Sequence, residues 1–265
     1  MPNTYAHYRF GQDVLRDLPE TKQHRIKKNL PLYLIGLHGP DILFYYHPFV
    51  TNSINSIGYQ MHDQTGKECF THFIPAVQNN IDPEAAYAYY MGFLCHFVLD
   101  SFCHPYIEEK IHRDHVYHTE IESAFDRMLL MQDGFNPANH SLVDHIVPTP
   151  WKAEVIAPFF KPARPSEVLY ALRSMVGYGR LIATDSEPKR KVLMGLLKIT
   201  GNYPEMHGML VSKTRDPRFD DSNQKLLALF TSAKHQFPFL MHEAEELLEG
   251  KALQDTRFDH TFSYF

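Results

Sequence analysis

The sequence lacks several features that would place it in common classes of protein. It has only three cysteines in 265 residues, without Cys-x-x-Cys spacing, so neither a disulfide framework nor a thiolate zinc site is indicated. Its longest apolar run, around Met91 to Leu99, contains a histidine and is too short and too polar to span a bilayer. It contains no Gly-rich phosphate loop, internal repeat or low-complexity tract. We therefore expect a globular protein with no transmembrane segment.

The net charge of the chain and its amino-terminal residues indicate which partners and which cellular location to expect. The formal net charge of −5 argues against a broad electrostatic surface for duplex nucleic acid or an anionic membrane. A local basic groove is compatible with that average. Residues 1–11 do not show the basic segment followed by an apolar segment that marks a signal peptide. Together with the scarcity of cysteine, this predicts a cytoplasmic, reduced location.

Apolar spacing and capping signals predict helices along most of the chain. Asp82 is suited to cap a helix that begins with Pro83. Because Pro105 disfavours helical geometry in the preceding residue, this helix is expected to end beside His104. Further helices are expected over about 3–18, 116–131, 166–184, 187–200 and 222–249.

Proline limits the helices of the second half. Residues 134–165 are rich in proline and should contain no long helix, and the last helix should kink or break near Pro238. The aromatic residues of 255–265 are expected to pack back onto the core. No segment alternates convincingly between apolar and polar residues, so we predict an all-α fold, with one multihelical domain over residues 1–265. Its first half, to about residue 125, would hold the chemistry, and residues 126–265 would complete the fold.

Histidine is abundant and concentrated in the first half. The chain has 17 histidines, and most of them lie between His7 and His118. His96 and Asp100 are four residues apart, as are His118 and Glu122, so on helices each pair would project imidazole and carboxylate from one face. Imidazole nitrogen and carboxylate oxygen together suit zinc and similar divalent metals.

A metal also explains why these polar residues occur among apolar ones. The residues around His96 are mainly phenylalanine and leucine, and burying an imidazole and a carboxylate there would be costly without partners. A single histidine among apolar residues is usually a core residue. Several histidines and carboxylates at metal-ligand spacing favour a metal site instead. We therefore predict metal ligation by five residues: His96, Asp100, His104, His118 and Glu122.

This pattern resembles the signature of the zinc-dependent phospholipase C family, which shares its all-α fold with the fungal single-strand-specific nucleases. The family signature is similar to His-x3-Asp-x3/5-His followed by His-x3-Glu or His-x3-Asp, which the five residues match. Upstream, the family has an early histidine, an aspartate after a Gly-Pro turn, and a further histidine. His7, Gly39-Pro40-Asp41 and His62 match these, so the resemblance covers about residues 5–125.

The resemblance implies a multinuclear zinc site. Asp41, His62, His96 and one oxygen of Asp100 would hold the first ion, and His104, His118 and Glu122 the second. His7, the other oxygen of Asp100 and the terminal amine would hold a third. Secreted members expose that amine by removing a signal peptide, and none is expected here, so two or three Zn²⁺ ions are expected.

The expected activity is phosphoester hydrolysis by a metal-activated water, which Asp41 would orient or deprotonate. The partner would be a phospholipid or a small phosphoester. A single-strand nuclease or nucleotidase on the same fold is the alternative, and its bases would need an aromatic platform. The candidates for that platform are Tyr45, Tyr46, Tyr89 and Tyr90.

Two further readings compete with this one. His62-Asp63 is slightly similar to the paired ligands of HD-domain phosphohydrolases, which would add His38 and Asp126 but leave the block from His96 to Glu122 unexplained. A metal-bound protein without catalytic activity, serving as a binding module, is the alternative of another class.

Overall fold

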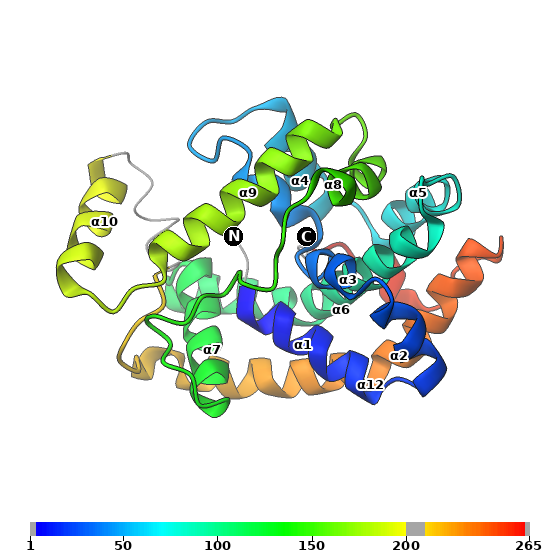
Figure 1. Cartoon of the computed structure of the whole chain (residues 1–265). Helices are drawn as coiled ribbons and strands as arrows, with labels where there is room; N and C mark the ends of the chain where they lie inside the picture. Colours follow the sequence, from blue (N-terminus) through cyan, green and yellow to red (C-terminus); the bar gives the residue numbers. More distant parts are fainter. Residues whose placement is uncertain (1–3, 200–209, 263–265) are drawn as a thin grey trace.

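The computed structural model describes residues 4–199 and 210–262, and among these residues helices dominate and no β-strand occurs (Figure 1). One isolated bridge joins Thr65 to Thr261. The predicted all-α fold is confirmed. The α-helices are α1 (Thr4–Asp17), α2 (Glu20–Lys27), α3 (Leu30–Gly36), α4 (Ser53–His62), α5 (Gly66–Gln78), α6 (Pro83–Asp114), α7 (His118–Gln132), α8 (Pro150–Ile156), α9 (Pro165–Ile182), α10 (Glu187–Ile199) and α12 (Asp220–Leu248). The 3₁₀ helices are η1 (Gly39–Tyr45), η2 (Ala157–Phe160), η4 (Pro217–Phe219) and η5 (Thr256–Asp259).

The helix α6 forms the centre of the molecule. Every residue from 85 to 101 is buried, which is typical of a helix that is surrounded on all sides. The helices α1, α2, α3, α5 and α12 all pack against it. The contact with α3 is close enough to require glycine, because a Cβ on Gly92 would lie 2.1 Å from the carbonyl oxygen of Tyr33.

The expected end of this helix beside His104 is wrong, because α6 continues through Pro105 to Asp114. Pro105 has no N–H to donate to the carbonyl of Ser101, one turn earlier. Nη1 of Arg257 donates to that carbonyl instead, at 3.0 Å, and the guanidinium lies 3.9 Å from the ring centroid of Phe102. A distant residue therefore stabilises the helix where the sequence predicts its end.

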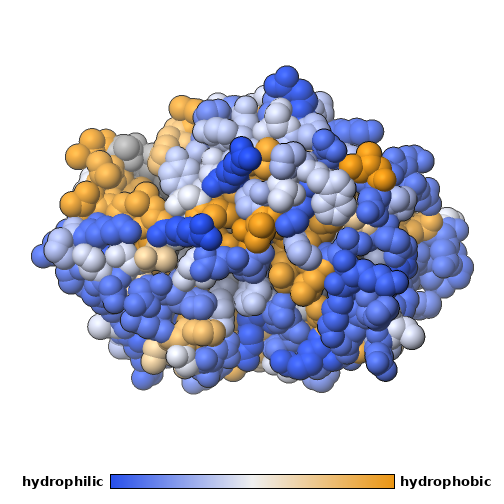
Figure 2. Space-filling model, in the orientation of Figure 1, coloured by the Kyte–Doolittle hydropathy of each residue, from blue (hydrophilic) through white to orange (hydrophobic). Residues whose placement is uncertain are grey.

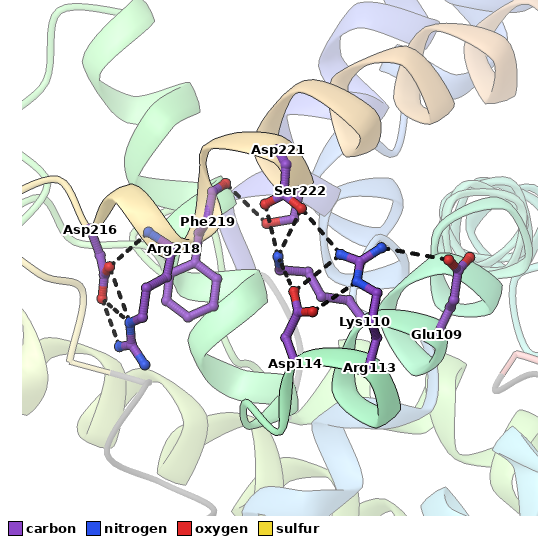
Figure 3. A network of polar contacts seen from close by, with 9 residues as sticks. All are labelled: Glu109, Lys110, Arg113, Asp114, Asp216, Arg218, Phe219, Asp221 and Ser222. Atoms are coloured by element: carbon purple, nitrogen blue, oxygen red, sulfur yellow. Dashed lines mark hydrogen bonds and ion pairs between the residues drawn. The ribbon is translucent and has the colours of Figure 1, made fainter.

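The carboxyl end of α6 is joined to the start of α12 by ion pairs (Figure 3). Lys110 is only 1% exposed, and its Nζ donates to Asp114 at 2.8 Å and to Asp221 at 2.8 and 3.0 Å. Asp221 lies in the first turn of α12, where a negative charge is favourable. The second half of the chain thus docks on the helix that carries the candidate ligands.

Most of the other expected elements are found, with shifted boundaries. The segment 134–165 contains only the short α8 and η2, as proline predicts. The last helix does not break, since α12 passes through Pro238. Phe258 and Phe262 are fully buried, which confirms the packing of the final aromatic segment; residue 200 and residues 263–265 lie outside the described residues. A single domain over the whole chain stays a prediction.

None of the described helices combines the length and the apolar character that a membrane span requires. Figure 1 shows α9 on one side of the central helix and α12 on the other.

Candidate metal centre

Eight side chains that can hold metal converge where α1, η1, α4, α6 and α7 meet. They form three groups in which the facing atoms lie within 4.8 Å of one another. The groups are His7, His96 and Asp100; Asp41, His62 and His96; and His104, His118 and Glu122. Six of the eight residues are buried, whereas the side chains of His62 and His118 are 13% and 31% exposed. The site therefore meets solvent at these two histidines.

Asp100 lies between two histidines that come from different helices. One turn of α6 brings Oδ2 of Asp100 to 3.0 Å from Nε2 of His96. On its other side, Oδ1 is 3.1 Å from Nε2 of His7 in α1. The two imidazoles stack with their ring centroids 4.3 Å apart. A carboxylate in this position can bridge two cations.

The turn before Asp41 allows η1 to lie directly against His96. Gly39 has a φ of +47°, a conformation that favours glycine, and a Cβ on it would lie 2.3 Å from Cδ2 of His96. Oδ2 of Asp41 is then 3.6 Å from Nε2 of His96, and its Oδ1 is 3.0 Å from Nε2 of His62. The glycine of the Gly-Pro turn is therefore required by its contact with His96.

Backbone carbonyls orient two of the imidazoles. Nδ1 of His62 lies 2.7 Å from the carbonyl oxygen of Gly58, and Nδ1 of His96 lies 3.3 Å from that of Leu37. A hydrogen on Nδ1 satisfies each carbonyl and leaves Nε2 free of a proton. This tautomer is the one that a metal needs, with the lone pair of Nε2 directed at the carboxylates.

The third group is built from α6 and α7. Nε2 of His118 is 3.0 Å from Oε1 of Glu122, one turn later on α7. Nε2 of His104 lies 3.7 Å from the same oxygen and 3.6 Å from Oδ1 of Asp100. Because α6 remains helical through Pro105, His104 lies one turn after Asp100 on the same face of the helix. Glu108 approaches the other nitrogen of His118 at 3.6 Å and can orient its ring.

The geometry fits a set of ligands around metal ions. Zinc bonds of about 2.0–2.1 Å place neighbouring ligands of a tetrahedral ion about 3.3 Å apart. The pairs of imidazole nitrogen and carboxylate oxygen that face one another lie 3.0–3.7 Å apart. Several polar atoms of the candidate ligands are buried without a hydrogen-bond partner among the described residues, namely both oxygens of Asp41, Nε2 of His96 and Oε2 of Glu122. Buried polar atoms of this kind are costly unless an ion satisfies them.

The charges of the site agree with this interpretation. Burial alone would raise the pKa of Asp100, but His96, His104 and His7 hold it well below its usual range. Burial likewise opposes the charged form of His118, yet Glu122 and Glu108 raise its pKa to about 9. Each carboxylate therefore favours a positive charge beside it, which a divalent cation supplies more strongly than an imidazolium.

Asp126 is not one of the eight candidate ligands, but it holds two of the helices that carry them together. It lies one turn after Glu122 on α7 and is 3% exposed. Its two oxygens accept hydrogen bonds from the backbone N–H groups of Tyr5, at 3.1 Å, and Ala6, at 2.8 Å. Burial raises its pKa to about 7, although these two bonds act in the opposite direction. Asp126 thereby ties the start of α1, with His7, to the helix that carries Glu122.

A pair of histidines beside the site was also missed by sequence reasoning. Nε2 of His38 and Nε2 of His145 are 2.7 Å apart, and the ring of His145 stacks on Tyr8 at 4.4 Å. Burial lowers the pKa of both, to about 4 for His145, so the pair is neutral at physiological pH. The two residues are 107 positions apart, and no local spacing connects them.

The HD-type ligand set is not brought together. His38 is engaged with His145, Asp126 caps α1, and Asp63 is exposed at the end of α4. None of these three residues belongs to a ligand group of the described chain. All eight residues expected from the spacing and the resemblance are brought together, and their role as ligands stays a prediction. The terminal amine expected for the third ion lies outside the described residues.

The fold and the site define an all-α protein built around a buried cluster of imidazole and carboxylate groups of the kind that hold divalent metals. A family model described as zinc dependent phospholipase C matches residues 6–164, more than half of the chain. The chain belongs to this family, and the matched range includes all eight residues of the site. No curated protein and no solved structure matches the chain. Family membership supports zinc as the metal and phosphoester hydrolysis as the class of reaction.

Proposed function

We propose that the protein is a multinuclear zinc-dependent phosphoester hydrolase, phospholipase C-like, that holds two or three zinc ions. The observation that carries the proposal is the position of Asp100, whose two oxygens face different histidines within contact distance of both. His96 belongs to two of the ligand groups, and Oδ1 of Asp100 lies 3.6 Å from Nε2 of His104 in the third, so the three groups form one cluster. Bound zinc would polarise the phosphate and lower the pKa of the attacking water.

Asp41 is the residue that we assign to the water. It is 1% exposed, and neither of its oxygens has a hydrogen-bond partner among the described residues. It belongs to the group that includes His62, through which the site meets solvent. A carboxylate held there can orient a water or accept its proton while it also contributes a ligand atom.

The tyrosines favour a phospholipid or a small phosphoester over a single-stranded nucleic acid. Tyr45, Tyr89 and Tyr90 are at most 5% exposed and belong to the core. Tyr46 is half-buried and packs its ring edge-on to Tyr170 at 5.2 Å. Four tyrosines were candidates for a stacking platform, and three of them offer no face to a base.

The test is a phosphoester panel with and without chelator, together with elemental analysis of the untagged protein. The panel contains phosphatidylcholine, lysophospholipid, single-stranded DNA and RNA, and a generic phosphodiester and phosphomonoester. We expect at least one metal per chain and chelator-sensitive hydrolysis that Asp100→Ala abolishes and Asp63→Ala, an exposed neighbour of His62, leaves intact.

Other outcomes of the panel would overturn parts of the proposal. A full set of metals without turnover of any phosphoester would support a binding module instead of an enzyme. Preference for single-stranded DNA or RNA would support the nuclease. Loss of metal in Asp63→Ala with retention in Asp100→Ala would favour the HD-type ligand set.

A further inference from the structure

The helix α10 carries an apolar stripe that the fold does not bury. Val192, Leu196 and Ile199 lie at positions i, i+4 and i+7, so they share one face of the helix. They are 62%, 53% and 84% exposed, and no residue of α10 is fully buried. Leu193 and Met194, which lie outside this stripe, are half-buried. Apolar exposure at helical spacing marks a surface that contacts something apolar.

Positive charge accompanies this stripe in a chain whose net charge is negative. The helix has four basic residues and one acidic residue, Glu187, which is paired with Lys213 at 2.7 Å. Lys189 and Lys191 form no ion pair with any residue that the structure describes. Lys189 is one turn before Val192 and seven residues before Leu196, so its flexible stem can lie along the stripe while its ammonium reaches out.

Arg190 attaches α10 to the rest of the protein, and the apolar stripe remains exposed to solvent. Arg190 donates to the backbone carbonyls of Thr184, Leu210 and Val211, at 3.0–3.2 Å. These bonds attach the first turn of α10 to the segments that precede and follow it. The contacts use the guanidinium of one basic residue, and Lys191 remains exposed.

A second exposed apolar segment lies between η1 and α4 and packs against α9. Phe49 and Val50 are 50% and 62% exposed, and the ring of Phe49 packs edge-on against Tyr178 of α9 at 5.9 Å. Figure 2 shows hydrophobic side chains gathered over α10 and continuing beside α9. The helix α9 also packs on η1, which holds Asp41, so the apolar segment at Phe49 lies against a helix that contacts the candidate site.

We propose that α10 docks the protein on an anionic phospholipid surface, with its apolar stripe among the acyl chains and Lys189 and Lys191 at the headgroups. The charge of the helix selects this occupant, because an apolar stripe bordered by lysine complements a negatively charged bilayer. The corollary, which rests on the proposed function, is that the substrate is a phospholipid in a membrane.

The test is co-sedimentation of chelator-treated full-length protein with vesicles of phosphatidylcholine alone or mixed with phosphatidylglycerol. The wild type should bind the mixed vesicles more tightly, and high salt should weaken that binding. Leu196→Asp and the double variant Lys189→Glu/Lys191→Glu should each weaken it by about tenfold or more. The matched controls are Phe239→Asp, at an apolar position of α12 that is 68% exposed, and Lys67→Glu/Lys225→Glu, at exposed lysines. Both controls should bind like the wild type.

Circular dichroism and hydrolysis of a monomeric short-chain phosphoester show that the variants are folded, because α10 contributes nothing to the candidate metal centre.

The proposal is overturned if the wild type binds neither vesicle, or if the α10 variants bind as it does. It is also overturned if the wild type is a dimer that Leu196→Asp makes monomeric, since α10 would then be a subunit interface. Vesicle binding without any phosphoester turnover would retain the docking surface and remove the enzymatic assignment. Turnover of the soluble substrate without vesicle binding would retain the enzymatic assignment and remove the docking surface.

Discussion

The imidazoles of His7 and His96 stack with their ring centroids 4.3 Å apart, and the carboxylate of Asp100 faces Nε2 of both. One residue comes from the first helix and the other from the central helix, so the contact joins two parts of the fold as well as two ligand groups. The consequences of removing the carboxylate, or the contacts that hold these helices in place, can be measured separately.

Asp100→Asn should remove at least one metal ion per chain. The amide has one acceptor oxygen and no negative charge, so it cannot bridge two cations. We expect hydrolysis to fall by about 100-fold or more, because even residues that only support metal ligands change activity by about 10- to 100-fold. Elemental analysis and the chelator-sensitive assay measure the two effects. Asp63→Asn makes the same change of charge at an exposed position, and an equal loss of metal there would contradict the assignment.

Asp126→Ala should loosen α1. The substitution leaves the N–H groups of Tyr5 and Ala6 without their acceptor, and an unsatisfied buried donor costs about 1–3 kcal/mol. The free energy of unfolding in urea, with chelator present, should fall by about that amount. Metal affinity should fall as well, because His7 is one residue from the released backbone. Asp126→Asn keeps a side-chain acceptor and should lose less; equal metal affinity in all three proteins would argue that Asp126 does not position His7.

Arg257→Met should destabilise the protein by about 1–2 kcal/mol, because the Ser101 carbonyl loses its donor and Phe102 loses its cation. Pro105→Ala restores the backbone N–H that this carbonyl lacks. The cost of Arg257→Met should therefore be smaller in the Pro105→Ala background, with a coupling of about 0.5–1.5 kcal/mol. A double-mutant cycle of unfolding free energies measures it. Strictly additive effects would show that Arg257 stabilises α6 by some other contact.

The ion pairs of Lys110 predict a dependence of stability on pH. Burial would raise the pKa of Asp221, but its hydrogen bond to Lys110 and the charges of Lys110 and Arg113 lower it. An acid whose pKa is lower in the folded state stabilises the protein above its unfolded pKa of about 3.9 and loses this effect as pH falls through its folded pKa. Asp221 is about half exposed, so solvent screening limits the contribution to about 1 kcal/mol or less.

Asp221→Asn should therefore be less stable than the wild type at pH 7, and the difference should shrink below pH 4. Urea unfolding of both proteins, with chelator present at each pH, gives this comparison. Asp63→Asn serves as the control for a simple change of net charge. A difference that persists unchanged at the acidic end would mean that the aspartate acts through its shape or packing and not through its charge.

Local patterns were sufficient to locate most of the long helices and two pairs of candidate ligands, but not to place the end of α6 or to decide that α12 continues through Pro238. Residues four apart on a helix lie on the same face. His96 could therefore be paired with Asp100, and His118 with Glu122, from the sequence alone. Family resemblance was needed to add His7, Asp41 and His62. These three residues lie on separate elements, and no periodicity relates them to α6.

The tertiary structure decided what depends on residues distant in the chain. Whether α6 passes Pro105 is a question of whether Ser101 finds a donor, and that donor, Arg257, is supplied by η5. The hydrogen bonds of Asp126 to α1 and the contact between His38 and His145 likewise exist only after the helices have packed. Sequence spacing specifies which side chains share a face of one helix, because that follows from the helical repeat. Which faces meet follows from the burial of the central helix by its neighbours, and no local pattern contains that information.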